Sequence, residues 1–206
     1  MAASYADPHF ADQRIVIKKL SVGPTDNNVY VLIDPATRAS VLVDASDELD
    51  RLVAAVADTK LQAIWLTHGD GDHIRVLEPL REALKVPVYM HDGDAGALTR
   101  PPDVRLNDGD VLPVGQLAFK VLHTPGHTAG GVCFHTDGHL IAGDTLFPGG
   151  PGNTKRPGGD FPLIIRMIRE KLFVLPDETR VYPGHGRDTT IGAERPHLDE
   201  WIARGW

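Results

Sequence analysis

The sequence predicts an α+β fold in which two β-sheets pack together and helices lie outside them. Hydrophobic residues make up 42% of the 206-residue chain and charged residues 24%, which is typical of a packed globular core. Short apolar, β-branched runs recur, and amphipathic helical runs follow groups of strands rather than each strand. This order favours layered sheets over alternating parallel βα units. The length suits one domain, so we expect residues 1–206 to form a single unit.

The first third of the chain has the pattern of an antiparallel strand meander. Its apolar runs cover 14–20, 27–33 and 39–44. The separators "SVGPTD" and "DPATR" carry the residues typical of turns. Residues 46–59 then have helical periodicity, with Ser46 as the candidate N-cap. The apolar run 61–68 that follows is expected to be a buried strand.

The rest of the chain repeats this style. A helix over 78–85 holds Pro79 in its first turn, where the missing N–H costs nothing. Strands are expected at 86–90, 117–124, 130–136, 139–144 and 179–185. A Gly/Pro-rich loop over 147–159 precedes a helix at 161–175, whose Leu163, Ile164, Met167, Ile168 and Leu172 are expected to face the core. A last helix, 195–206, starts at Pro196.

Composition excludes several function classes. The formal net charge is −7 and no Lys/Arg run is present, so nucleic acid is not an expected partner. No stretch approaches the roughly 20 apolar residues that span a bilayer, and the N-terminus lacks the pattern of a secretory signal. The single cysteine, Cys133, fits a reducing cytoplasm. We therefore expect a cytoplasmic protein with a small-molecule substrate, and the sequence leaves its oligomeric state open.

Potential metal ligands follow several predicted strands. The side chains concerned are His68, His73, His127, Asp144 and His185. Loops at strand ends are where a rigid sheet can aim side chains at one point. Any one of these residues could be an ordinary polar loop residue, but their joint placement predicts a metal site.

Four motifs carry these residues: "THGDGDH" (67–73), "HTPGHT" (123–128), "AGDTLF" (142–147) and "YPGHG" (182–186). In order and spacing they resemble the metallo-β-lactamase-fold superfamily, whose pattern is His-x-His-x-Asp-His followed by a lone His, a lone Asp and a final His. The resemblance runs from about Asn27 to Gly186. It implies a four-layer αβ/βα sandwich with two divalent ions in a cleft at one edge.

The resemblance also implies the ligands. The first ion would be held by His68, Asp70 and His127, the second by Asp72, His73 and His185, with Asp144 bridging both. Zinc is the first expectation, and iron or manganese also accept such ligands. Two ions would lower the pKa of a shared water, and Asp72 would orient the metal-bound hydroxide as catalytic residue.

Asp70 departs from the family, which carries histidine at this position. An aspartate is shorter and adds a negative charge, which would leave the cluster neutral and a poorer Lewis acid. Three hypotheses remain open. Asp70 is a true ligand of the first ion, or it misses the metal and leaves a weak first site or a single ion, or catalysis has decayed.

The flanking sequence is most similar to short glyoxalase II-like (hydroxyacylglutathione hydrolase-like) thioesterases. This implies a metallo-hydrolase that cleaves a hydroxyacyl thioester. The family's Gly-Arg-Thr-Asp loop is replaced here by residues 152–155, and we expect the chain to lack the helical C-terminal domain of longer glyoxalase II enzymes. Lys155 and Arg156 are candidate contacts for an acidic substrate group, although solvated loop charges would explain them equally well.

Two alternatives compete with this hypothesis. Persulfide dioxygenases use one iron held by the equivalents of His68, His127 and Asp144, so a failed ligand at position 70 would leave their set intact. A metal-binding protein with little hydrolytic activity is the other. β-Lactamase activity is less favoured, because those enzymes are usually exported.

Three further residues are candidates for supporting the ligands: Asp44, Thr67 and His123. Asp44 ends an apolar strand, where it could hold a ligand histidine or loop backbone. The other five histidines match no ligand motif and are expected to be structural or on the surface.

Overall fold

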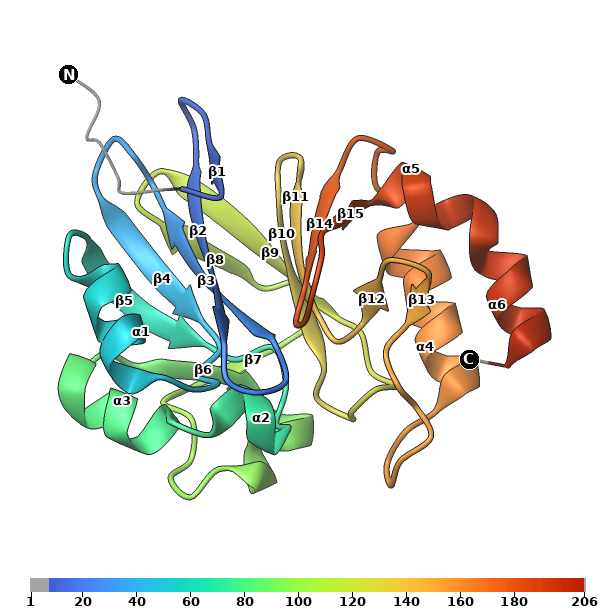
Figure 1. The fold of residues 1–206 in the computed structure, drawn as a ribbon, viewed down its shortest axis with the longest axis horizontal. Coiled ribbons are helices and arrows are strands. Elements are labelled where there is room, and N and C mark those ends of the chain that lie inside the picture. Colours follow the sequence, from blue (N-terminus) through green and yellow to red (C-terminus); the bar gives the residue numbers. More distant parts are fainter. Residues whose placement is uncertain (1–7, 206) are drawn as a thin grey trace.

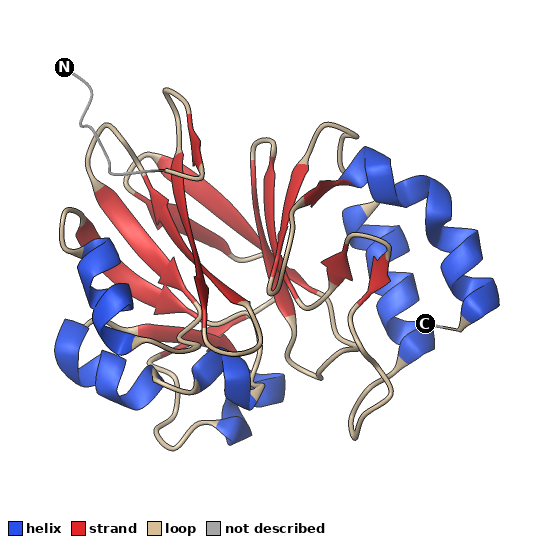
Figure 2. Ribbon diagram, viewed as in Figure 1, coloured by secondary structure: helices blue, strands red, loops and turns tan. Residues whose placement is uncertain are grey.

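The computed structural model describes residues 8–205 and contains two β-sheets packed face to face (Figure 1). Helices cover the outer face of each sheet (Figure 2). This is the predicted α+β sandwich of the metallo-β-lactamase fold. The predicted end of the last helix, at Trp206, lies outside the described residues.

The first sheet has seven strands in chain order: β1 (Phe10–Ala11), β2 (Val16–Val22), β3 (Asn27–Ile33), β4 (Ala39–Val43), β5 (Lys60–Trp65), β6 (Val88–His91) and β7 (Val104–Leu106). β2, β3 and β4 pair antiparallel, which confirms the predicted meander. β4 to β7 pair parallel. The ends of β4 and β5 therefore meet at one edge of the sheet.

The second sheet has the order β15-β14-β11-β10-β9-β8. Its strands are β8 (Val111–Val114), β9 (Leu117–His123), β10 (Val132–Thr136), β11 (His139–Gly143), β14 (Arg180–Pro183) and β15 (Thr189–Thr190). A small ribbon, β12 (Leu146–Phe147) with β13 (Gly150–Pro151), overlaps the start of the predicted 147–159 loop. β11 and β14 pair parallel, so Asp144 and His185 leave the sheet at the same end.

The helices are α1 (Leu49–Val56), α2 (Gly71–Ile74), α3 (Leu77–Leu84), α4 (Phe161–Met167), α5 (Ile191–Glu194) and α6 (Leu198–Arg204). Short 3₁₀ turns cover Asp92–Ala97 and Arg195–His197, and a π-helical turn, Ile168–Leu172, continues α4. α1 and α3 lie on the first sheet, and α4 to α6 lie beside the second (Figure 1).

Strand alternation explains the layers. In β3, Tyr30 and Leu32 point into the core between the sheets, whereas Val29, Val31 and Ile33 pack under α1 and α3. All five are fully buried, because period-2 alternation presents both faces of a central strand to apolar neighbours. A third apolar cluster joins the second sheet to α4 and α6.

Two helix predictions were wrong in detail. α1 begins after Glu48, not after Ser46, because Glu48 adopts a left-handed backbone conformation with φ of 54°, which a right-handed helix cannot include. In the helix at 161–175, Leu163 is half-buried and Ile165 is buried instead. Among residues 8–205, no helix is long and apolar enough to cross a membrane.

Asp34 links the two sheets at the end opposite the predicted ligands. Its carboxylate accepts hydrogen bonds from the backbone N–H of Gln116 at 2.8 Å, the hydroxyl of Thr37 at 2.6 Å and the backbone N–H of Ala36 at 2.9 Å. Burial alone would raise the pKa of Asp34, but these donors outweigh it and lower the pKa. The ionised carboxylate therefore stabilises the fold.

We expect Asp34→Asn to lower the free energy of unfolding at pH 7 by about 1.5–3 kcal/mol, the usual range for hydrogen bonds to a charged group. Since the folded pKa lies below the unfolded value, this stabilisation is present above the unfolded pKa and is lost as the pH falls through the folded one. The difference should thus shrink below about pH 4. Urea unfolding at pH 7 and in acid measures it, with exposed Asp50→Asn as control. A pH-independent difference would contradict the prediction.

Candidate metal centre

The structure gathers six of the predicted ligands at the edge where β5, β9, β11 and β14 end. They form two groups in which the ligand atoms lie within 4.8 Å of one another: His68, His127 and Asp144, and Asp72, His73 and His185. Four of these residues follow strands, and Asp72 and His73 lie on α2. The order of strands in the two sheets thus brings distant parts of the chain to one point.

Each ligand histidine is anchored through its Nδ1 atom. His73 Nδ1 donates to Asp44 at 2.9 Å, His127 Nδ1 to the carbonyl of Asn153 at 2.7 Å, and His185 Nδ1 to the carbonyl of Thr25 at 2.9 Å. Because each acceptor requires a protonated Nδ1, the Nε2 atom of a neutral ring keeps its lone pair.

His68 obeys the same rule through a relay. The Thr67 hydroxyl donates to Asp44 at 2.8 Å, so its oxygen accepts from His68 Nδ1 at 2.9 Å. Asp44 also accepts the Thr67 backbone N–H at 2.8 Å. One buried carboxylate therefore orients His73 directly and His68 indirectly, a frequent arrangement behind metal-binding histidines.

The inward-facing atoms suit a divalent cation. His68 Nε2 and Asp144 Oδ1 are buried and have no hydrogen-bond partner. His73 Nε2 and His185 Nε2 face each other at 3.2 Å, which two lone pairs tolerate only with a proton or cation between them. Imidazole nitrogens and carboxylate oxygens are ligands of zinc, iron and manganese. The residues present therefore fit such ions.

The protonation of the apo site follows from its neighbours. Burial, aided by the nearby His73, lowers the pKa of His68 to about 3. Burial also opposes charging of His73, but the hydrogen bond and charge of Asp44 outweigh it and raise the pKa of His73 to about 9. Burial would raise the pKa of Asp144, yet its hydrogen bond with His185 and the surrounding histidines lower it. Asp144 is thus an anion at neutral pH.

Asp72 stands at the open side of the second group. Partial burial raises its pKa, but the side-chain amide of Asn27, which donates to Asp72 Oδ2 at 3.0 Å, lowers it overall. Asn27 in turn is placed by a backbone bridge to His185. The carboxylate is therefore ionised and held towards the ligand histidines.

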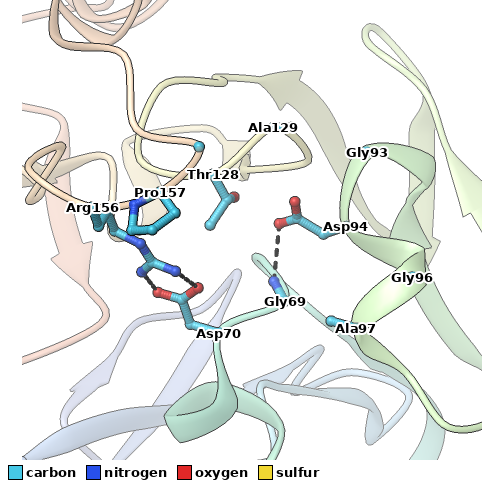
Figure 3. Close-up of a pocket in the computed structure, with 11 residues that line it drawn as sticks. Gly69, Asp70, Gly93, Asp94, Gly96, Ala97, Thr128, Ala129, Arg156 and Pro157 are labelled. Atoms are coloured by element: carbon cyan, nitrogen blue, oxygen red, sulfur yellow. Dashed lines mark hydrogen bonds and ion pairs between the residues drawn. The ribbon is translucent and has the colours of Figure 1, made fainter.

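Asp70 does not join either group of ligand atoms. The Arg156 guanidinium binds it with two hydrogen bonds, Nη2 to Oδ1 at 2.5 Å and Nη1 to Oδ2 (Figure 3). Asp70 Oδ2 still lies 3.0 Å from His127 Nε2 and 3.6 Å from His68 Nε2. Of the two candidate substrate contacts, Arg156 thus reaches the centre, whereas Lys155 is exposed.

The His123 side chain does not contact a ligand. Its Nε2 lies 3.0 Å from the carbonyl of Ala129, and its ring stacks on His91 with ring centroids 3.8 Å apart. Alternation along β9 puts His123 on the same face as Phe119 and Val121, and this face packs towards the first sheet.

Sequence reasoning missed Asp94, which ties two site loops together. Its carboxylate accepts the backbone N–H of Gly69 at 3.0 Å (Figure 3). It also accepts the backbone N–H of Gly130 at 2.8 Å. The available signal was an acidic residue soon after the predicted strand at 86–90. A cleft of about 340 Å³ opens beside it, lined by Gly69, Asp70, Gly93, Asp94, Gly96, Ala97, Thr128, Ala129, Arg156, Pro157 and Gly158.

Comparisons with known proteins agree with this geometry. Residues 22–185 match the metallo-beta-lactamase superfamily. The probable metallo-hydrolase YqgX of Bacillus subtilis is 33% identical over 199 residues, which cover 86% of this chain and 93% of that protein.

Two solved structures are similar over most of their length. The BLEG-1 B3 metallo-beta-lactamase is 31% identical with a TM-score of 0.83, and the match covers 88% of this chain and 97% of that one. ETHE1 from Myxococcus xanthus is 33% identical with a TM-score of 0.81, covering 88% and 82%. The chain therefore belongs to the metallo-β-lactamase superfamily.

Proposed function

We propose that this chain is a metal-dependent hydrolase that cleaves a thioester of the hydroxyacyl-thiol type. In this proposal it binds two divalent ions, and zinc is the first expectation for their identity. The observation that carries the proposal is the meeting of two ligand groups around Asp144. Asp144 Oδ1 lies 3.4 Å from His73 Nε2, and its Oδ2 lies 3.6 Å from His127 Nε2 and 3.5 Å from His185 Nε2. One carboxylate can therefore reach an ion in either group.

The proposed ligands are His68, His127 and Asp144 for one ion, and Asp72, His73, His185 and Asp144 for the other. Bound divalent ions would lower the pKa of water and polarise a carbonyl group. Asp72, held by Asn27, would orient the attacking water and accept its proton. Asp44 and Thr67 would fix the ring orientations. The matches to the metallo-beta-lactamase superfamily and to a probable metallo-hydrolase support metal-dependent hydrolysis as the general activity.

A thioester suits the groups that the cleft offers. Water oxygen bonds to the carbonyl carbon, the C–S bond breaks, and the sulfur departs as a thiolate. Since a thiol has a pKa of about 8.5, the thiolate leaves without prior protonation. Asp70 and Asp94 line the cleft, and each carboxylate accepts hydrogen bonds from donors of the protein. Neither needs to be a general acid for this reaction.

A mononuclear-iron persulfide dioxygenase is the second candidate. It is favoured by one observation: the first group, His68, His127 and Asp144, is complete without Asp70. Against it, a single ion would leave the well-anchored group of Asp72, His73 and His185 without a role. A metal-binding protein with little hydrolytic activity is the remaining alternative.

Two assays separate these candidates. With zinc-loaded protein we expect thiol release from a lactoyl thioester of glutathione or coenzyme A, with kcat/KM of about 10⁴ M⁻¹s⁻¹ or above. The activity should vanish on chelation and return with metal. Oxygen uptake with glutathione persulfide by the iron-loaded protein, without thiol release from either thioester, would favour the dioxygenase. Bound metal with no turnover in either assay would favour the binding protein.

A further inference from the structure

The Asp70–Arg156 pair occupies the place of the second histidine in the family's His-x-His-x-Asp-His motif. The Asp70 side chain is 13% exposed and that of Arg156 34% exposed, so the pair is partly shielded from solvent. Arg156 Nη1 also lies 3.3 Å from His127 Nε2. The guanidinium therefore stands against two groups that would otherwise face the first ion.

The loop that carries Arg156 is built against the site. Its Asn153 carbonyl accepts from His127 at 2.7 Å, and a Cβ at Gly152 would come within 1.9 Å of the Asp144 carbonyl oxygen. A turn closed by the Gly159 N–H on the Arg156 carbonyl at 3.0 Å follows. These contacts fix the backbone on both sides of Arg156, so its reach to Asp70 is a property of the fold.

Charge explains why the two residues belong together. An aspartate in place of a neutral histidine adds one negative charge, and the positive charge of an arginine bound to it compensates that charge. The pair thus has the net charge of a neutral histidine. The neutral metal cluster and weaker Lewis acidity expected from Asp70 alone are therefore not expected when Arg156 is bound to it. A carboxylate that is bound bidentately by a guanidinium is, however, poorly available to a cation.

We propose that Arg156 is a positioning residue that withholds Asp70 from the first ion. The first ion is then bound by His68, His127 and Asp144 alone, and Asp70 becomes its fourth ligand only when Arg156 is removed. The inference rests on the proposed two-ion site and is independent of the thioester substrate.

The test is a double-mutant cycle on metal binding. Metal-stripped protein is titrated with Zn²⁺ against a chelating dye, and with Co²⁺ followed by its visible absorption, which reports the ligand set. Arg156→Gln should tighten one of the two binding steps by about tenfold or more and change the Co²⁺ spectrum, since a bound carboxylate is added. Asp70→Asn should leave the Co²⁺ spectrum unchanged while Arg156 is present, because the ligand set stays the same, although the unpaired charge of Arg156 weakens cation binding. In the double variant, the gain should disappear.

Arg166→Gln is the matched control, because it removes one positive charge from exposed α4 surface. It should leave both steps unchanged, which separates ligand release from general electrostatics. Two results would overturn the inference: a changed Co²⁺ spectrum for Asp70→Asn alone, or no gain for Arg156→Gln. If the unmodified protein binds no metal, the proposed function fails first.

Discussion

Asp144→Asn is expected to lower thioesterase kcat/KM by more than about 100-fold, because even residues that only support a ligand cost 10–100-fold when lost. The asparagine is nearly isosteric but lacks the negative charge, and in our proposal Asp144 serves both ions. The variant should therefore bind both ions more weakly, and its metal content should fall by more than one ion per chain. Steady-state kinetics with a lactoyl thioester and elemental analysis of dialysed protein measure the two effects.

The control for Asp144→Asn is Asp50→Asn, which makes the same chemical change on the exposed side of α1. It should retain full activity and metal content. Retention of both ions by Asp144→Asn would contradict the bridging role. Loss of one ion only would assign Asp144 to a single group and would likewise contradict the bridging role.

Gly184→Ala should be nearly as damaging, although it changes no polar atom. A Cβ at this position would lie 2.1 Å from Asp144 Oδ1 and 2.7 Å from His73 Cε1. His73 cannot easily give way, since Asp44 holds its ring. Because misplacement by about 1 Å can cost about 100-fold, we expect activity to fall by that order. The circular dichroism spectrum should be unchanged.

Gly71→Ala tests whether the loss at Gly184 is local. Gly71 begins α2 close to the same ligands, but a Cβ there meets nothing within 4 Å. We expect normal activity and metal content. Equal losses of activity in the two variants would mean that Gly184→Ala acts by disturbing the fold, rather than the geometry of Asp144 and His73.

The elements that could be predicted are those whose apolar runs are long and uninterrupted. β3, with seven buried residues, and the strands before each motif belong to this class. β8 was missed, because Pro113 interrupts its pattern. Pro113 is exposed on an edge strand that, within residues 8–205, pairs with β9 alone. This is the setting in which a strand accepts proline.

The candidate site could be predicted to the level of its ligands and of two side chains behind them, Asp44 and Thr67, but not of the remaining partners. The ligands sit in short motifs with fixed spacing, whereas most of the groups that orient them come from elsewhere in the chain. Asn153 and Thr25 act through backbone carbonyls, which any residue type supplies. Arg156 meets Asp70 across 86 positions of sequence, and no periodicity relates residues so far apart.

Asp44 has a consequence for how such a site can change over evolutionary time. It adopts a positive backbone φ of 68°, unusual for a residue with a side chain. Its Oδ2 atom serves one histidine of each ligand group, one directly and the other through the Thr67 hydroxyl. A substitution there would disturb the two groups together. Selection could tune either ion through side chains that contact one group alone, such as Arg156 beside the first and Asn27 beside the second, but position 44 can vary only in concert with the whole centre.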